Sequence, residues 1–434
     1  MVIFKNLKNA GSMCRAFFLC LLFSGLLLAG DAKARLYIDV YSPQARKIQI
    51  AVPYFRAEGL GKPALGQEYS EILSSALLFH GVFNVVDPAA YGGSDVYDWR
   101  KLGAEFVVKS RFKLTENRLV LNLMLLDVVE GKILLNESYA GNVAEAREHM
   151  HGFCDLVVKT LTGEPGISGS KIVFVGTVPN GKEVFIADFD GDNPGMATSD
   201  RSIVLSPKIS PDGSEIAFTS YREGTPIIYV KHLVTGKIRK LAGFKGTNLS
   251  PAWSPDGKSL AVSLSKEGHS QIFLLDRQGQ IIRRLTENWG INVSPTWAPD
   301  GRQLAFVSDI SGGPQIYVLD LQTMKQRRLT FEGKYNTAPE WSPRGDKIVY
   351  NSMRDSHFEI CTIDVKSGKV DRLTSNSGNN ENPSWSPDGR QIVFSSSRDG
   401  RPGLFVMFAD GSGQRRILKT SGSETQPCWS RRLD

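Results

Sequence analysis

Cysteine and histidine are scarce in this 434-residue sequence, with five and six copies. Cys14 and Cys20 lie in the predicted signal region, and the other three cysteines are widely separated, which excludes a dense disulfide framework. We expect Cys154, Cys361 and Cys428 to be small buried apolar residues. His149 and His151 come nearest to a metal motif, but residues two apart on a helix point to different sides. We therefore expect exposed helix surface there and no bound metal.

Catalytic motifs are also missing. There is no Gly-x-Ser-x-Gly elbow of an α/β-hydrolase and no Gly-x-x-x-x-Gly-Lys phosphate loop. We predict that the chain is not an enzyme and uses no cofactor. The formal net charge is only +7 and is spread along the chain. Nucleic-acid binding usually requires a concentrated basic face, so we do not expect a nucleic-acid partner.

Apolar runs are short, and the longest one spans residues 16–29 near the start of the chain. Basic residues precede it, and Ala32 and Ala34 follow as the small residues that a signal peptidase reads. We predict a signal peptide over residues 1–34, a mature protein in the periplasm, and no transmembrane segment in the mature chain. A membrane anchor is the alternative, but the run is shorter than the roughly 20 residues of a spanning helix.

A repeat of 44 residues dominates the remaining sequence. Proline recurs at this interval without drift, at Pro207, Pro251, Pro295, Pro339, Pro383 and Pro427. The position two residues later holds Ile209, Trp253, Trp297, Trp341, Trp385 and Trp429. A second proline follows in five repeats, and Asp-Gly follows that proline in four of the five, which is typical of a tight turn.

Each repeat contains four short runs with strand character, which is the signature of a propeller blade. The fold class that we predict is mainly β: a six-bladed β-propeller of four-stranded blades, preceded by a small α/β domain. The last strand, near residues 427–429, should complete the blade that begins at Lys171 and close the ring. Residues 202–205 are expected to form the fourth strand of that blade. The tryptophans should fill the gaps between neighbouring blades.

The region before the repeats has mixed helical and strand patterns. Residues 67–79 and 143–161 show helical spacing, and the runs between them alternate as strands do. The expected boundaries are an α/β domain over 35–162, a linker over 163–170 and a propeller over 171–434.

A ring of polar residues is expected at one mouth of the propeller. Three residues before the repeat prolines stand Asn248, Asn292, Asn336, Asn380 and Glu424. Ring symmetry would gather them around the channel, together with the variable loops between second and third strands, as a recognition surface. An alternative role, compatible with the first, is that each Asn caps a local turn.

The segments Ser-Pro-Ala-Trp-Ser-Pro-Asp-Gly (residues 250–257) and Asn-Pro-Ser-Trp-Ser-Pro-Asp-Gly (residues 382–389) resemble the propeller repeats of the TolB family. The order of signal, small domain and six blades is similar as well. The resemblance implies a periplasmic adaptor of the Tol–Pal system that supports outer-membrane invagination at cell division and outer-membrane integrity. Its implied partners are Pal, TolA and other outer-membrane proteins.

Site residues follow from the same resemblance. The implied Pal-binding residues at the propeller mouth are Thr247, Asn248, Ser250, Asn292, Ser294, Asn336, Asn380 and Glu424. The implied TolA-binding segment is Arg35, Leu36, Tyr37, Ile38, Asp39, Val40, Tyr41 and Ser42; an edge strand of the front domain is its other interpretation. Thr247 departs from the family, which often has His there. The alternative function is a propeller enzyme or lectin that acts on a cell-envelope sugar or peptide.

Overall fold

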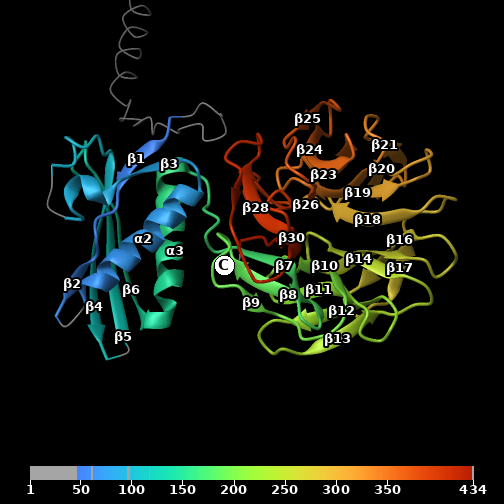
Figure 1. Ribbon diagram of the computed structural model, residues 1–434, viewed down its shortest axis with the longest axis horizontal. Coiled ribbons are helices and arrows are strands. Elements are labelled where there is room, and N and C mark those ends of the chain that lie inside the picture. Colours follow the sequence, from blue (N-terminus) through green and yellow to red (C-terminus); the bar gives the residue numbers. More distant parts are fainter. Residues whose placement is uncertain (1–45, 60–61, 95–97, 117, 433–434) are drawn as a thin grey trace, which may run out of the picture. The chain divides into compact units, whose positions relative to one another are not determined.

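The computed structural model describes residues 46–59, 62–94, 98–116 and 118–432. The predicted signal peptide and the segment 35–42 lie outside the described residues. The described chain is an α/β domain followed by a six-bladed, four-stranded β-propeller, as the sequence predicts (Figure 1). Within the described residues, no helix is long and apolar enough to cross a membrane.

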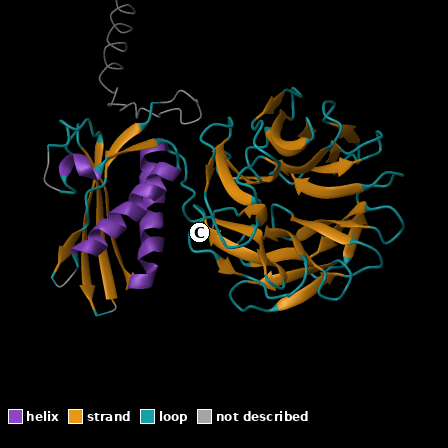
Figure 2. Cartoon of the chain, in the orientation of Figure 1, coloured by secondary structure: helices purple, strands orange, loops and turns teal. Residues whose placement is uncertain are grey.

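The α/β domain is built on one sheet with strand order β3-β1-β4-β5-β6, and β2 pairs with β4. The strands are β1 (Ile48–Ala51), β2 (Arg56–Glu58), β3 (Phe83–Val86), β4 (Phe106–Thr115), β5 (Arg118–Asp127) and β6 (Ile133–Asn142). The helices α2 (Pro63–Phe79) and α3 (Ala146–Thr162) pack on one face of this sheet (Figure 2). Short 3-10 helices are η1 (Pro88–Tyr91) and η2 (Val143–Glu145).

Helix α2 begins four residues before the expected start at residue 67. Pro63 stands at its first position, where the missing N–H costs nothing because helix N-terminal amides have no partner within the helix. Apolar spacing alone therefore places the start of such a helix too late in the sequence. The Glu145 carboxylate accepts a hydrogen bond from the Asn142 amide (3.0 Å), and the two residues form a capping pair ahead of α3.

The propeller has six sheets of four antiparallel strands. Blade 1 contains β30 (Glu424–Trp429), β7 (Lys171–Val178), β8 (Gly181–Asp188) and β9 (Gly195–Met196). Blade 2 contains β10 (Val204–Ile209), β11 (Glu215–Ser220), β12 (Ile227–His232) and β13 (Ile238–Ala242). Blade 3 contains β14 (Asn248–Trp253), β15 (Ser259–Leu264), β16 (Gln271–Asp276) and β17 (Ile281–Arg284). Blade 4 contains β18 (Asn292–Trp297), β19 (Gln303–Ser308), β20 (Gln315–Asp320) and β21 (Gln326–Arg328). Blades 5 and 6 contain β22 (Asn336–Trp341), β23 (Lys347–Arg354), β24 (His357–Asp364), β25 (Val370–Arg372); β26 (Asn380–Trp385), β27 (Gln391–Ser396), β28 (Gly403–Phe408), β29 (Arg415–Arg416).

The first strands are the innermost, because each contacts the first strands of both neighbouring blades and β30 contacts β10. The ring therefore closes as predicted, with β30 paired to β7. The prediction for residues 202–205 was wrong: β9 is the fourth strand of blade 1, and Val204 already begins β10. A two-residue outer strand is too short to leave a periodic signal in the sequence.

Every inner strand carries a bulge at the same repeat position. The residue before the repeat proline has a φ of 49° to 53° in all six blades, and these residues are Ser206, Ser250, Ser294, Ala338, Asn382 and Gln426. Left-handed backbone is uncommon outside glycine. The proline that follows lacks an N–H, which suits a position where the ladder is interrupted.

The repeat tryptophans join neighbouring blades, as predicted. Trp253 donates its indole N–H to the Lys208 carbonyl of the preceding inner strand (3.1 Å), and Trp297 does the same to the Ala252 carbonyl (3.0 Å). Trp341 differs and bonds within its own blade, to the Gly345 carbonyl. The prediction of buried, unpaired cysteines at positions 154, 361 and 428 is confirmed.

Candidate functional site

The channel has two chemically different mouths. All six inner strands run in the same direction, so their first residues meet at one end and their last residues at the other. We call the first end the asparagine mouth; it is formed by Val204, Asn248, Asn292, Asn336, Asn380 and Glu424. We call the second end the tryptophan mouth; it is formed by Ile209, Trp253, Trp297, Trp341, Trp385 and Trp429.

The asparagine side chains are buried, and the side-chain NH2 group of each donates hydrogen bonds inside the protein. Asn248 accepts a hydrogen bond from the Phe244 amide (2.9 Å) and donates to the Phe244 carbonyl (2.8 Å), which caps the turn before β14. Asn336 donates to the Gln315 side chain (2.8 Å) on the third strand of the preceding blade. The ring of Asn residues therefore caps turns and ties neighbouring blades together.

Glu424 plays the same role with a charge. Its carboxylate accepts from the Thr420 amide (2.7 Å) and pairs with Arg416 (3.0 Å), and it is completely buried. Thr247, Ser250 and Ser294 are half-buried. Of the implied Pal-binding residues, these three present more surface at the mouth than the buried Asn and Glu side chains.

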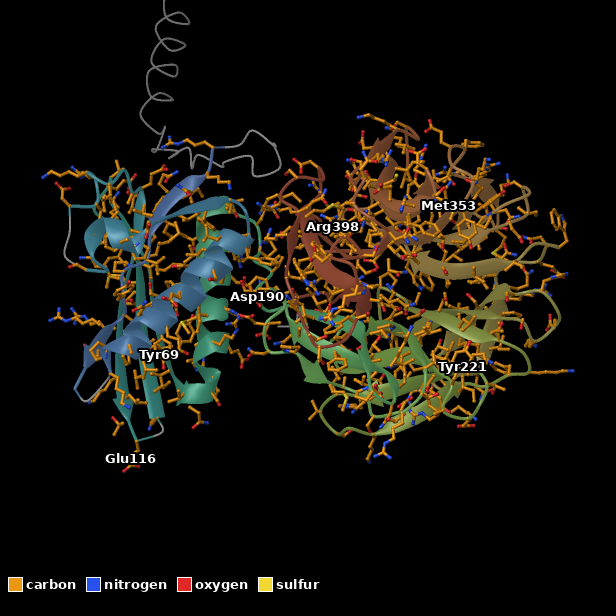
Figure 3. All side chains as sticks on the ribbon, viewed as in Figure 1. Tyr69, Glu116, Asp190, Tyr221, Met353 and Arg398 are labelled. Carbon is orange, nitrogen blue, oxygen red and sulfur yellow. The ribbon has the colours of Figure 1, made fainter. Side chains whose placement is uncertain are left out.

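Large apolar side chains are exposed on the loops that surround the asparagine mouth. Trp289 is 67% exposed and Ile291 46% exposed between β17 and β18. Phe331 is 73% exposed and Tyr335 42% exposed between β21 and β22. Met353, at the end of β23, is 38% exposed and is labelled in Figure 3. Exposed aromatic and methionine side chains of this kind are typical of protein-binding surfaces.

The sequence interpretation missed these residues because it followed what repeats. Trp289 and Phe331 lie in loops whose composition changes from blade to blade, so the 44-residue repeat does not predict a role for either residue. An aromatic residue inside a polar loop was the signal available.

An ion pair crosses the channel between opposite blades. Lys208 of β10 lies 2.8 Å from Glu340 of β22, three blades away in a ring of six. The second carboxylate oxygen of Glu340 accepts from the Ser384 hydroxyl (2.6 Å) and the Trp385 amide (2.9 Å). Burial lowers the pKa of Lys208, but the Glu340 carboxylate outweighs it and the pKa is raised overall. The pair links opposite sides of the ring between the two mouths.

The tryptophan mouth contains a recess of about 150 Å³ lined by Trp341, Trp385, Trp429, Glu340 and Arg431, among others. Pockets for small ligands usually have at least about 300 Å³. The indole N–H of Trp385 donates to the Glu340 carbonyl and that of Trp429 to the Ser170 hydroxyl. This recess therefore offers little to a sugar or a peptide.

The expectation of exposed surface at residues 149–151 was wrong for His151, which is buried and stacks edge-on against Phe189. Burial, together with the nearby Arg147 guanidinium, lowers the pKa of His151 to about 4. His149 stacks on Tyr139. Arg147, which precedes these residues on α3, pairs with three aspartates of the β8–β9 turn, Asp188, Asp190 and Asp192.

Among the described residues, one group has donor atoms close enough together to share a metal ion: His80, Cys154 and Asp155. Two of these side chains, His80 and Asp155, already accept hydrogen bonds from the backbone of the linker. The Ile167 amide donates to His80 (3.1 Å), and the Ser168 amide donates to Asp155 (2.9 Å). We therefore interpret the group as an anchor for the linker backbone.

Comparisons with known proteins identify the family. The model described as TolB beta propeller domain matches residues 158–433, and the TolB amino-terminal domain model matches residues 36–134. A Tol-Pal system protein TolB of Desulfotalea psychrophila is 37% identical over 258 residues, which cover 57% of this chain and 58% of the relative. The protein of the same name from Desulfosudis oleivorans is 40% identical over 214 residues, covering 46% and 49%. These alignments thus span about half of each curated relative.

A solved structure gives a longer match. The crystal structure of TolB from Acinetobacter baumannii superposes with a TM-score of 0.78 at 29% sequence identity. The superposition covers 89% of this chain and 97% of that chain. Because a family model matches more than half of the residues, this chain belongs to the TolB family.

Proposed function

We propose that this chain is a non-catalytic periplasmic adaptor of the Tol–Pal system that binds Pal at the asparagine mouth. The observation that carries the proposal is the set of exposed Trp289, Phe331 and Tyr335 side chains on loops of a closed, hydrogen-bonded ring. A rigid scaffold lowers the entropic cost of binding, because its loops are already held in place. The curated relatives, named as Tol-Pal system proteins, support the same role.

The roles of the residues at the mouth differ. Asn248, Asn292, Asn336, Asn380 and Glu424 hold the loops from inside, whereas Ser250 and Ser294 are half-buried and can make polar contacts. Thr247 is also half-buried, and its hydroxyl donates to the Ser265 hydroxyl (2.9 Å). The large apolar side chains would supply most of the binding energy, as central aromatic anchors do in other interfaces. In this proposal TolA binds the segment 35–42, and the complex supports outer-membrane invagination and integrity at division.

The experiment is calorimetric titration of the chain from Arg35 onward with the soluble domain of Pal from the same organism. We expect one-to-one binding that Trp289→Ala or Phe331→Ala weakens about 30-fold or more, as for hot-spot residues. Val234→Ala is the matched control: Val234 is 88% exposed but lies between β12 and β13, away from the asparagine mouth.

The outcomes separate the parts of the proposal. No binding of Pal by the unaltered chain would refute the adaptor role. Equal loss in Val234→Ala would remove the asparagine mouth as the site. Deletion of residues 35–42 should abolish TolA binding and leave Pal binding in place; retention of TolA binding would refute the second assignment.

A further inference from the structure

The two faces of the α/β sheet are covered differently. Helices α2 and α3 pack on one face, where Tyr69 of α2 meets Phe112 of β4. The opposite face is partly covered by the segment after β3, in a cluster that includes Tyr91, Trp99 and Val107. Beyond Val107, the alternate residues of β4 on this face are exposed.

This open part of the sheet is strongly basic. Lys109, Arg111 and Lys113 occupy alternate positions of β4 and are all exposed. Arg56 of β2 is in register with Arg111, and Arg118 at the start of β5 pairs with Thr115 on the same face. We call these five residues the basic face.

Residues that pair across neighbouring strands form rows on the sheet. In the rows that contain the basic face, the other residues are neutral except for one acid. Met124 and Asn136 stand beside Lys109, and Asn122 and Ser138 beside Arg111. Glu58 of β2, 3.6 Å from Arg111, is the acidic residue among the described positions of these rows. The net charge of these rows is therefore +4, from five basic residues and one acid. Of the basic face, only Arg111 has an ion-pair partner within the described chain.

Exposed aliphatic residues adjoin the basic face at one end. Val129 in the turn between β5 and β6 is 69% exposed, and Ile133 at the start of β6 is 56% exposed. Ile133 pairs with Leu126, which lies one row beyond the Lys109 row on the same face. Leu134, at the bulge beside it, is 36% exposed. A flat basic area next to aliphatic side chains matches the interface of an anionic lipid bilayer.

We propose that the basic face binds the surface of a bilayer containing anionic phospholipids, with Val129, Ile133 and Leu134 entering the headgroup layer. The charges are spread in two dimensions over β2, β4 and β5, which suits a planar partner. An acidic peptide strand would pair along the free edge of β6, whose positions on this face carry no basic residue. This inference does not depend on binding at the asparagine mouth.

The test is cosedimentation of the chain from Arg35 to Asp434 with vesicles. One set of vesicles is phosphatidylcholine alone and the other contains phosphatidylglycerol as well. We expect binding to the second set only, weakening as salt is added. Each basic residue near an anionic surface changes the partition coefficient about fivefold, so replacing Lys109, Arg111 and Lys113 by Gln should lower it about 100-fold.

The matched control removes equal charge elsewhere. Lys237, Lys325 and Lys366 are exposed on turns of the propeller, and their replacement by Gln should leave vesicle binding unchanged. Ile133→Ser combined with Val129→Ser should reduce binding while keeping its salt dependence. Thermal melting of each variant checks that it is folded.

Three results would overturn the proposal. The first is that the unaltered chain does not bind phosphatidylglycerol vesicles. The second is that the control triple variant loses binding as much as the β4 variant does. The third is that the chain binds polyglutamate through the basic face but does not bind vesicles, which would indicate an acidic protein partner instead.

Discussion

Replacement of Glu340 should destabilise the propeller. Replacement of Lys208, its partner in the ion pair, should destabilise the propeller less. Glu340→Ala leaves the Lys208 ammonium without a counter-ion in the channel and also removes the acceptor of the Ser384 hydroxyl and the Trp385 amide. Lys208→Met leaves the carboxylate with both of those donors. We therefore expect Lys208→Met to cost less free energy of unfolding than Glu340→Ala.

The exposure of the two side chains sets the magnitude. Breaking a fully buried pair costs about 3–5 kcal/mol, and an exposed pair contributes at most about 1 kcal/mol. The side chains of Lys208 and Glu340 are 32% and 17% exposed. We place the cost of Glu340→Ala between these limits, at about 2 kcal/mol, which corresponds to a melting temperature lowered by about 4–8 °C.

The assay is thermal and urea unfolding followed by tryptophan fluorescence, for both single variants and for Lys208→Met combined with Glu340→Ala. The double variant should be more stable than the sum of single effects predicts, by about 1 kcal/mol, because no charge is left unpaired. Glu332→Ala is the control: the Glu332 side chain, which pairs with Arg354, is 71% exposed, and the effect of its loss should stay within about 0.5 kcal/mol. A Glu340→Ala variant as stable as this control would refute the reasoning.

Two further predictions concern pH and turns. Because the pKa of His151 is about 4 in the folded chain and ordinarily 6.5, the unfolded chain binds more protons between these values. The free energy of unfolding should therefore fall as the pH falls through this window, by at most about 3 kcal/mol. In His151→Phe the urea midpoint should depend less on pH. An unchanged pH dependence in this variant would contradict the attribution of the effect to His151. Asp256 accepts hydrogen bonds from the Ser254 hydroxyl and the Lys258 amide, so Asp256→Ala should cost about 1 kcal/mol in urea unfolding. Asp300 has Ala two residues before it and accepts from one amide, so Asp300→Ala should cost about half as much, and equal effects would speak against the turn hydrogen bonds.

Repetition made the fold predictable from the sequence. Residues that must meet an identical environment in each blade, such as Trp253 and Trp297, recur at a fixed interval and reveal both the blade and its innermost strand. Closure by β30 followed from counting the strands. The outermost strand of blade 1 was misplaced because β9 has two residues and therefore shows no alternation.

The candidate site was harder to predict because it consists of what does not repeat. The position of the Asn ring was predictable, but the burial of its side chains was not. Their burial depends on the third strand of the preceding blade, where Gln315 accepts a hydrogen bond from Asn336. Trp289 and Phe331 break the pattern of their loops and carry no period. Lys208 and Glu340 become partners only when the number of blades is known.

Closure of the ring by β30 also has a consequence for folding. Lys171 and Ser430 are hydrogen-bonded neighbours although 259 residues separate them. Contacts between residues so far apart in the chain raise the contact order, and a high contact order slows folding. Blade 1 cannot be completed until residues 424–429 have been synthesised, so until then β7 has an unpaired edge. The synthesis of β30 thus sets the time during which the edge of β7 is open to strand-to-strand aggregation.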